Sequence, residues 1–149
     1  MNDLDSRKKT GRFRIRLGLG IMVIGLILFT LGVNPGIYGL DRSPVVGFVQ
    51  IAVFLVGLAI ICLGGYISLN TFWNGREKTI PADIGYRMVS TGYVLAAVSG
   101  MADVFGFGSQ PFPSTPYFGP WQAIGVIIGE LIIVGGFVLL IPSPPKKSI

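Results

Sequence analysis

The sequence predicts an all-α integral membrane protein, a bundle of four helices with both termini in the cytoplasm. Three observations lead there. Of the 149 residues, 51% are hydrophobic and only 13% are charged, whereas a soluble domain carries about 25% charged residues. Four apolar runs alternate with short segments that hold most of the charges. Finally, the 22 glycines recur at regular spacings inside those runs.

The first two apolar runs have the length of membrane-spanning helices, which need roughly 20 mostly apolar residues. We predict the first helix over 13–33, after a basic arm over 1–12, because the uncharged run from Leu17 to Val33 ends at Asn34-Pro35-Gly36. We predict the second helix over 44–69. Ser43 suits its N-cap and Pro44 its first position.

The last two runs complete the set, although the third is less apolar. We predict the third helix over 80–107, behind Thr79 and with Asp83 in its first turn. The fourth is predicted over 120–141 and is followed by a proline-rich tail over 142–149. The chain is therefore interpreted as one membrane domain over 1–149.

The basic residues orient these helices, since cytoplasmic segments carry the excess of Lys and Arg. With four spans and the N-terminus inside, every one of the 12 basic residues except Arg42 falls on the cytoplasmic side. We therefore expect a plasma-membrane protein with both ends in the cytoplasm. The basic arm is expected to bind the anionic inner leaflet of the lipid bilayer, and no nucleic acid. The cations of the arm and of the helix start that follows it are Arg7, Lys8, Lys9, Arg12, Arg14 and Arg16.

The composition also excludes several kinds of chemistry. The chain has no His and one Cys, Cys62, which rules out a Ser-His-Asp triad, a Cys-His pair and His-ligated zinc or haem within the chain. A lipid-active enzyme would need a polar cluster at an interface, and Glu77, Lys78, Asp83 and Arg87 show no distinctive spacing for one. We expect no enzyme activity, no cofactor and no metal.

The glycines and one alanine recur four or seven residues apart, which places them on one face of each helix. Lipid tails give helices no hydrophobic drive to associate, so close packing over small residues supplies much of the association energy. These faces either build the bundle itself, or one of them is left for oligomerisation. The predicted packing residues are Gly18, Gly25, Gly32, Gly57, Gly64, Gly92, Ala96, Gly100, Gly125 and Gly129, with Gly136 one heptad further.

Glu130 is the most informative single residue, because it lies near the predicted midplane among isoleucine, valine and leucine. An ionised carboxylate is costly there, so this side chain should turn inward and be protonated or paired. It is either a structural carboxyl bonded between helices or a functional group, as a proton relay, a coupling-ion site or a cation site. The candidate polar site comprises Glu130, Tyr93, Thr91, Asp103, Gln50 and Arg87.

Two functions remain open. The first is a non-enzymatic four-span protein that packs through its glycine faces, as an accessory or assembly subunit of a larger membrane complex or as a homo-oligomer. The second is a small transporter or proton-linked channel that uses Glu130. In its size and its single central acid the chain resembles the small four-helix multidrug transporters, which carry their acid in the first helix rather than the fourth.

Overall fold

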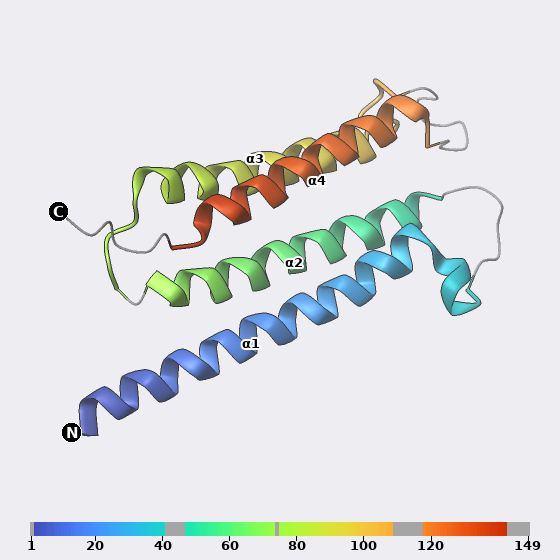
Figure 1. Ribbon diagram of the computed structural model, residues 1–149. Helices are drawn as coiled ribbons and strands as arrows, with labels where there is room; N and C mark the ends of the chain where they lie inside the picture. Colours follow the sequence, from blue (N-terminus) through green and yellow to red (C-terminus); the bar gives the residue numbers. More distant parts are fainter. Residues whose placement is uncertain (1, 41–46, 74, 109–117, 143–149) are drawn as a thin grey trace.

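The computed structural model describes residues 2–40, 47–73, 75–108 and 118–142, and it is all-helical (Figure 1). Helix α1 runs over Asn2–Val33 and is followed by a short 3-10 helix, η1, over Pro35–Tyr38. Helices α2, α3 and α4 run over Phe48–Trp73, Ile80–Gly100 and Pro120–Leu140. The predicted all-α fold is confirmed.

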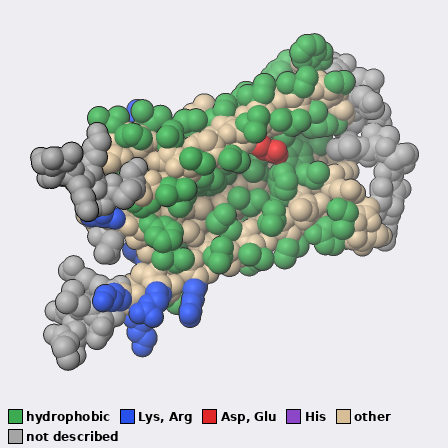
Figure 2. Space-filling view, in the orientation of Figure 1, with side chains coloured by type: hydrophobic (Ala, Val, Ile, Leu, Met, Phe, Trp, Pro, Cys, Tyr) green, Lys and Arg blue, Asp and Glu red, His purple; other side chains and the backbone are tan. Residues whose placement is uncertain are grey.

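Three of the four helices are long and apolar enough to cross a membrane, over Lys8–Val33, Phe48–Trp73 and Pro120–Leu140. Their surface is hydrophobic along most of its length, and Lys and Arg gather at one end of the molecule (Figure 2). These features are those of a membrane protein. Helix α3 has 21 residues but is not among the three, so its predicted span is not confirmed.

The helices form two hairpins rather than the even four-helix bundle that the sequence predicts. Helix α1 packs along α2 and α3 packs along α4, whereas far fewer contacts join α2 to α3 and α4 (Figure 1). Among the described residues, α1 contacts neither α3 nor α4. A bundle with equivalent interfaces is therefore not confirmed.

Small residues set the spacing within the first hairpin. A Cβ atom added at Gly25 would lie 2.7 Å from the backbone nitrogen of Ile61, and one added at Gly64 would lie 2.6 Å from the carbonyl oxygen of Gly18. Real Cβ atoms essentially never come closer than 3.0 Å to such neighbours. The two backbones are thus closer than any larger residue at these positions would allow.

Small residues also set the spacing within the second hairpin. A Cβ atom added at Gly92 would lie 2.5 Å from the Gly129 carbonyl oxygen, and one added at Gly136 would lie 2.7 Å from the Gly85 carbonyl oxygen. Gly125 faces Ser99 in the same way. In both hairpins, residues seven apart on one helix meet residues seven apart on its partner, which is the spacing of antiparallel helices that stay in contact over several turns.

Aromatic side chains join the two hairpins at the end of the molecule where α2 and α4 end. The Trp73 indole N–H donates to the Leu140 carbonyl over 3.0 Å. The Tyr66 hydroxyl donates to the Tyr86 carbonyl over 2.8 Å and lies 3.0 Å from the Ser90 hydroxyl. Because these bonds satisfy polar groups between helices, they fix how α2 sits against α3 and α4.

Three helix boundaries differ from the predicted ones. Helix α1 begins at Asn2, because the basic arm holds no proline and its single glycine, Gly11, does not interrupt the helix that extends the first span. Helix α2 continues to Trp73, where the indole bond to Leu140 holds its last turn. Helix α3 ends at Gly100 instead of residue 107, since the chain then forms turns up to Gly106, whose φ is 85°. The predicted start of the second helix at Ser43 and Pro44 lies outside the described residues.

Candidate functional site

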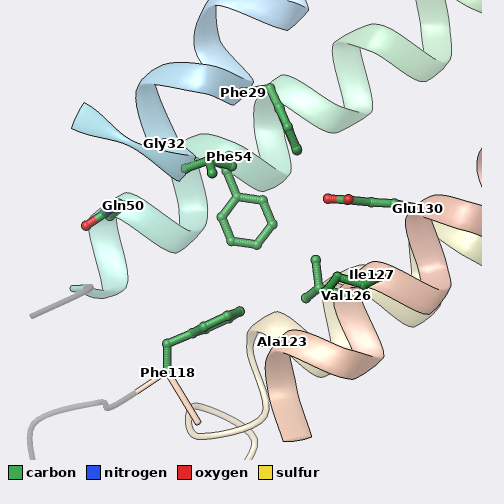
Figure 3. A pocket seen from close by; sticks show the side chains of 10 residues that line it. Phe29, Gly32, Gln50, Phe54, Phe118, Ala123, Val126, Ile127 and Glu130 are labelled. Carbon is green, nitrogen blue, oxygen red and sulfur yellow. The ribbon is translucent and has the colours of Figure 1, made fainter. Parts of the chain in front are cut away.

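Glu130 lies at the midpoint of α4 and extends into a cavity of about 360 Å³ between the two hairpins. Figure 3 shows its side chain crossing the cavity from α4 toward Phe29 and Phe54. The side chain is half-buried. The described lining consists of Phe29, Gly32, Val33, Gln50, Phe54, Phe118, Ala123, Val126, Ile127 and Glu130.

The register of α4 explains why Glu130 faces this cavity. Gly129 packs against α3, and the next residue is turned about 100° around the helix, away from that contact. In the first hairpin, Gly57 occupies the place that Gly129 has in the second, and the residue after it is Leu58. Leu58 is buried in the core. Glu130 is thus a charged residue at a position where the equivalent side chain of the other hairpin is apolar.

Three phenylalanine rings form the apolar wall opposite the carboxyl group. The Phe54 ring meets Phe29 and Phe118 edge-on, with ring centroids 6.2 Å and 6.4 Å apart. Such rings present partly negative faces to a neighbouring group. Aromatic faces and a carboxylate in one cavity are the two features that attract an organic cation.

Within the described part of the chain, no hydrogen bond or ion pair reaches the Glu130 carboxyl group. Gln50 is the other polar residue of the lining, and its amide is directed away from Glu130 (Figure 3). Glu130 is therefore the single ionisable side chain in this described lining.

The other residues of the predicted polar site do not join Glu130. The Tyr93 hydroxyl donates to the Leu55 carbonyl over 3.5 Å, and so links α3 to α2. Thr91 is exposed on the outer face of α3. Arg87 forms an exposed ion pair with Asp83 of the same helix, at 3.3 Å.

Asp103 follows the end of α3 and is buried, with 4% of its surface exposed. It packs against the backbone of Gly108, so that no side chain would fit at that glycine. Neither residue lines the Glu130 cavity. The structure thus brings two of the six predicted residues, Glu130 and Gln50, to one cavity.

The aromatic wall was not predicted. Phe29, Phe54 and Phe118 come from α1, α2 and the residues before α4, and no spacing in the sequence relates them. The one available signal was that Phe29 and Phe118 lie within a few residues of helix ends that are predicted on the same side of the membrane.

The cavity has the composition of a binding site and lacks that of a metal centre. In the ranges that the structure describes, no group of three or more His, Cys, Asp or Glu side chains could hold a metal ion. What the arrangement offers is one carboxyl group surrounded by apolar and aromatic surface. Comparison of the chain with protein-family models, curated proteins and solved structures finds no match.

Proposed function

We propose that the chain is a non-enzymatic, four-span membrane protein that binds lipophilic organic cations from the bilayer at Glu130. The observation that carries the proposal is the Glu130 carboxyl group, which extends into an apolar cavity of ligand size between the hairpins. Small-molecule sites are typically apolar concavities of about 300–1,000 Å³ with a few polar groups that orient the ligand.

The charge of Glu130 selects the ligand. An ionised carboxylate is costly in apolar surroundings unless a cation pairs with it. The empty cavity therefore favours the protonated acid, and a bound cation favours the carboxylate. Cation binding then releases a proton, which is the elementary step of a proton-linked transporter.

The walls of the cavity define the rest of the ligand. Its apolar body would lie against Phe54 and Val126, and its positive centre would lie between Glu130 and the aromatic faces. Amines, quaternary ammonium ions and phosphonium ions with apolar substituents meet both requirements. Soluble metal ions do not, because this lining supplies a single carboxylate as a charged ligand.

The proposed topology places Glu130 near the membrane midplane. Helix α3 has 21 residues, which at about 1.5 Å per residue gives roughly 30 Å, the thickness of the hydrocarbon core. It packs along α4, which is itself long and apolar enough to span. With four spans, the basic residues of the arm and of the segment after Trp73 fall together on the cytoplasmic side of the plasma membrane.

Replacing Glu130 by glutamine is expected to weaken binding of tetraphenylphosphonium, a permanent lipophilic cation, by at least about 30-fold. Removing one partner of a desolvated charge pair costs roughly 2 kcal/mol or more. Binding is measured by equilibrium dialysis with the full chain in phosphatidylcholine nanodiscs.

The matched control is Glu77→Gln, which removes the same charge from an exposed residue outside the cavity. It should bind tetraphenylphosphonium like the unmodified chain. Equal binding by all three proteins would contradict the proposal, because the cation would then be held by the bilayer or by apolar contact alone.

A second candidate function is an accessory or assembly role, and the outer face of α3 favours it. Helix α3 is not among the helices apolar enough to span, and Arg87 and Thr91 are exposed on it. The glycine faces already meet one another within the hairpins. We propose that α3 of a second copy covers this face, making the protein a homo-oligomer.

Cysteine at position 91 is expected to form a disulfide-linked dimer in membranes, in a Cys62→Ala background that removes the buried native thiol. A two-fold interface on α3 brings the two cysteines of a dimer together. Leu26→Cys, exposed on α1, is the matched control and should stay monomeric. Equal cross-linking of both variants, or of neither, would overturn the dimer through α3.

A further inference from the structure

A second cavity lies at the opposite end of the first hairpin from the Glu130 site, where α1 and α2 separate. It measures about 600 Å³ and lies between the first turns of α1, the last turn of α2 and the residues that follow Trp73. Its described lining is Ser6, Thr10, Gly11, Arg14, Asn70, Thr71, Trp73, Gly75, Arg76 and Lys78.

The heptad pattern of the hairpin explains why the helices separate here. Gly11 lies seven residues before Gly18 and continues the glycine row of α1. Gly18 packs closely against Gly64 and Ser68, but Gly11 faces Thr71, whose methyl carbon would lie 3.9 Å from an added Cβ. The larger side chain on α2 holds the helices apart, and the cavity opens at that turn.

The charges of this cavity have one sign. Arg14, Arg76 and Lys78 line it, and none of its described lining residues is acidic. Glu77 lies between two of these cations in the sequence but is not part of the lining. The Lys78 ammonium group lies 4.5 Å from the centroid of the Tyr86 ring, which fixes its position at the cavity edge.

Arg76, which follows the end of α2, has more N–H donors than the two that bond nearby carbonyl groups. Its Nε and Nη2 atoms bond the Trp73 and Phe72 carbonyls, each over 3.4 Å, and so offset the partial negative charge of the helix end. A guanidinium group has five N–H donors. The remaining donors of Arg76, together with Arg14, Lys78 and the Asn70 amide, are available to an anion.

We propose that this basic cavity binds a doubly charged phosphate group. Arginine forks and a lysine ammonium group match the several oxygens and the double negative charge of that group. The cavity adjoins the end of a spanning helix. The phosphate therefore belongs either to a lipid headgroup or to a free phosphate in solution. This site is independent of Glu130 and of any cation bound there.

The fluorescence of Trp73 reports on the cavity that it lines. The chain has two tryptophans, and Trp121→Phe leaves Trp73 as the single one. The full chain with this change, in phosphatidylcholine nanodiscs, is titrated with dioctanoyl phosphatidic acid and, separately, with inorganic phosphate. A saturable change is expected, and Arg14→Gln and Lys78→Gln should each weaken it by about ten-fold.

The matched control is Arg12→Gln, which removes the same charge from the same helix outside the cavity. It should leave the affinity within about two-fold, since the exposed Arg12 side chain lines a different pocket and its charge is screened by solvent. A response to phosphatidic acid alone would identify a lipid headgroup as the ligand. A response to both probes would show that free phosphate is sufficient for binding. Lys78 lies outside the α1–α2 contact, so Lys78→Gln tests the site without loosening the hairpin.

Two results would overturn the phosphate site. One is an equal loss of affinity in the Arg12, Arg14 and Lys78 variants, which would indicate attraction by net charge alone. The other is the absence of a saturable response to either probe. Neither result bears on tetraphenylphosphonium binding at Glu130.

Discussion

Leucine in place of Gly25 is expected to destabilise the protein by roughly 1–3 kcal/mol or more, the usual cost of inserting bulk into a packed interface. An added Cβ atom at this position would already lie 2.7 Å from the Ile61 backbone nitrogen and 2.9 Å from the Gly57 carbonyl oxygen. Backbone atoms cannot turn aside as a side chain can. The two helices must therefore separate over several turns. This separation removes the close packing contacts that hold helices together in lipid, where no hydrophobic effect favours their association.

Thermal unfolding in mild detergent measures this effect, with a dye that fluoresces on reaction with the buried thiol of Cys62, the single cysteine. The midpoint should fall by about 5 °C or more. Gly20→Leu is the matched control on the same helix, because nothing lies within 4 Å of an added Cβ there. Equal midpoints for the two variants would contradict the close contact of α1 and α2.

The glycine spacing could be read from the sequence, but the pairing of the helices could not. Rows such as Gly18, Gly25 and Gly32 indicate a packing face by periodicity alone. Periodicity does not say which helix covers that face. An even bundle was therefore predicted, whereas the close contacts lie within each hairpin, even though the shortest connection between helices, over 74–79, joins α2 to α3.

The third helix shows where periodicity misleads. A step of four residues selects Gly92, Ala96 and Gly100 as one face, and the first two do pack against Gly129. Gly100 instead contacts Phe54 of the other hairpin, and the residue that meets Gly136 is Gly85. Gly85 follows Pro81 in the first turns of the helix, where a glycine also suits a helix end, so no packing role is evident for it from the sequence.

One part of the candidate site, Glu130, was accessible to sequence reasoning for an energetic reason. An acid among apolar residues in a spanning helix is costly, so Glu130 stands out without any structure. Its predicted neighbours Thr91 and Tyr93 were chosen by depth in the membrane, and depth does not determine which way a side chain points. The aromatic wall depends on contacts between elements distant in the chain, which no local pattern encodes.

Phe54→Ala is expected to have the largest effect on stability and also to weaken cation binding. Phe54 is buried, with 5% of the residue surface exposed. Its backbone and Cβ lie against Gly32 of α1, and its ring lies against Gly100 of α3 and against the rings of Phe29 and Phe118. Removing a buried phenylalanine costs about 3–5 kcal/mol. The same truncation removes the cavity wall that faces Glu130, so tetraphenylphosphonium should bind at least about ten-fold more weakly.

Phe48→Ala is the matched control, since it removes the same ring from the first turn of the same helix, where 45% of the residue surface is exposed. The Cys62 thiol assay and the dialysis assay should both show it close to the unmodified chain. Phe54→Leu separates the two effects: it refills most of the packed volume but restores no aromatic face. Stability should therefore recover more than cation binding does. Equal recovery of both would mean that the wall contributes only packing, and the aromatic part of the proposed cation site would be wrong.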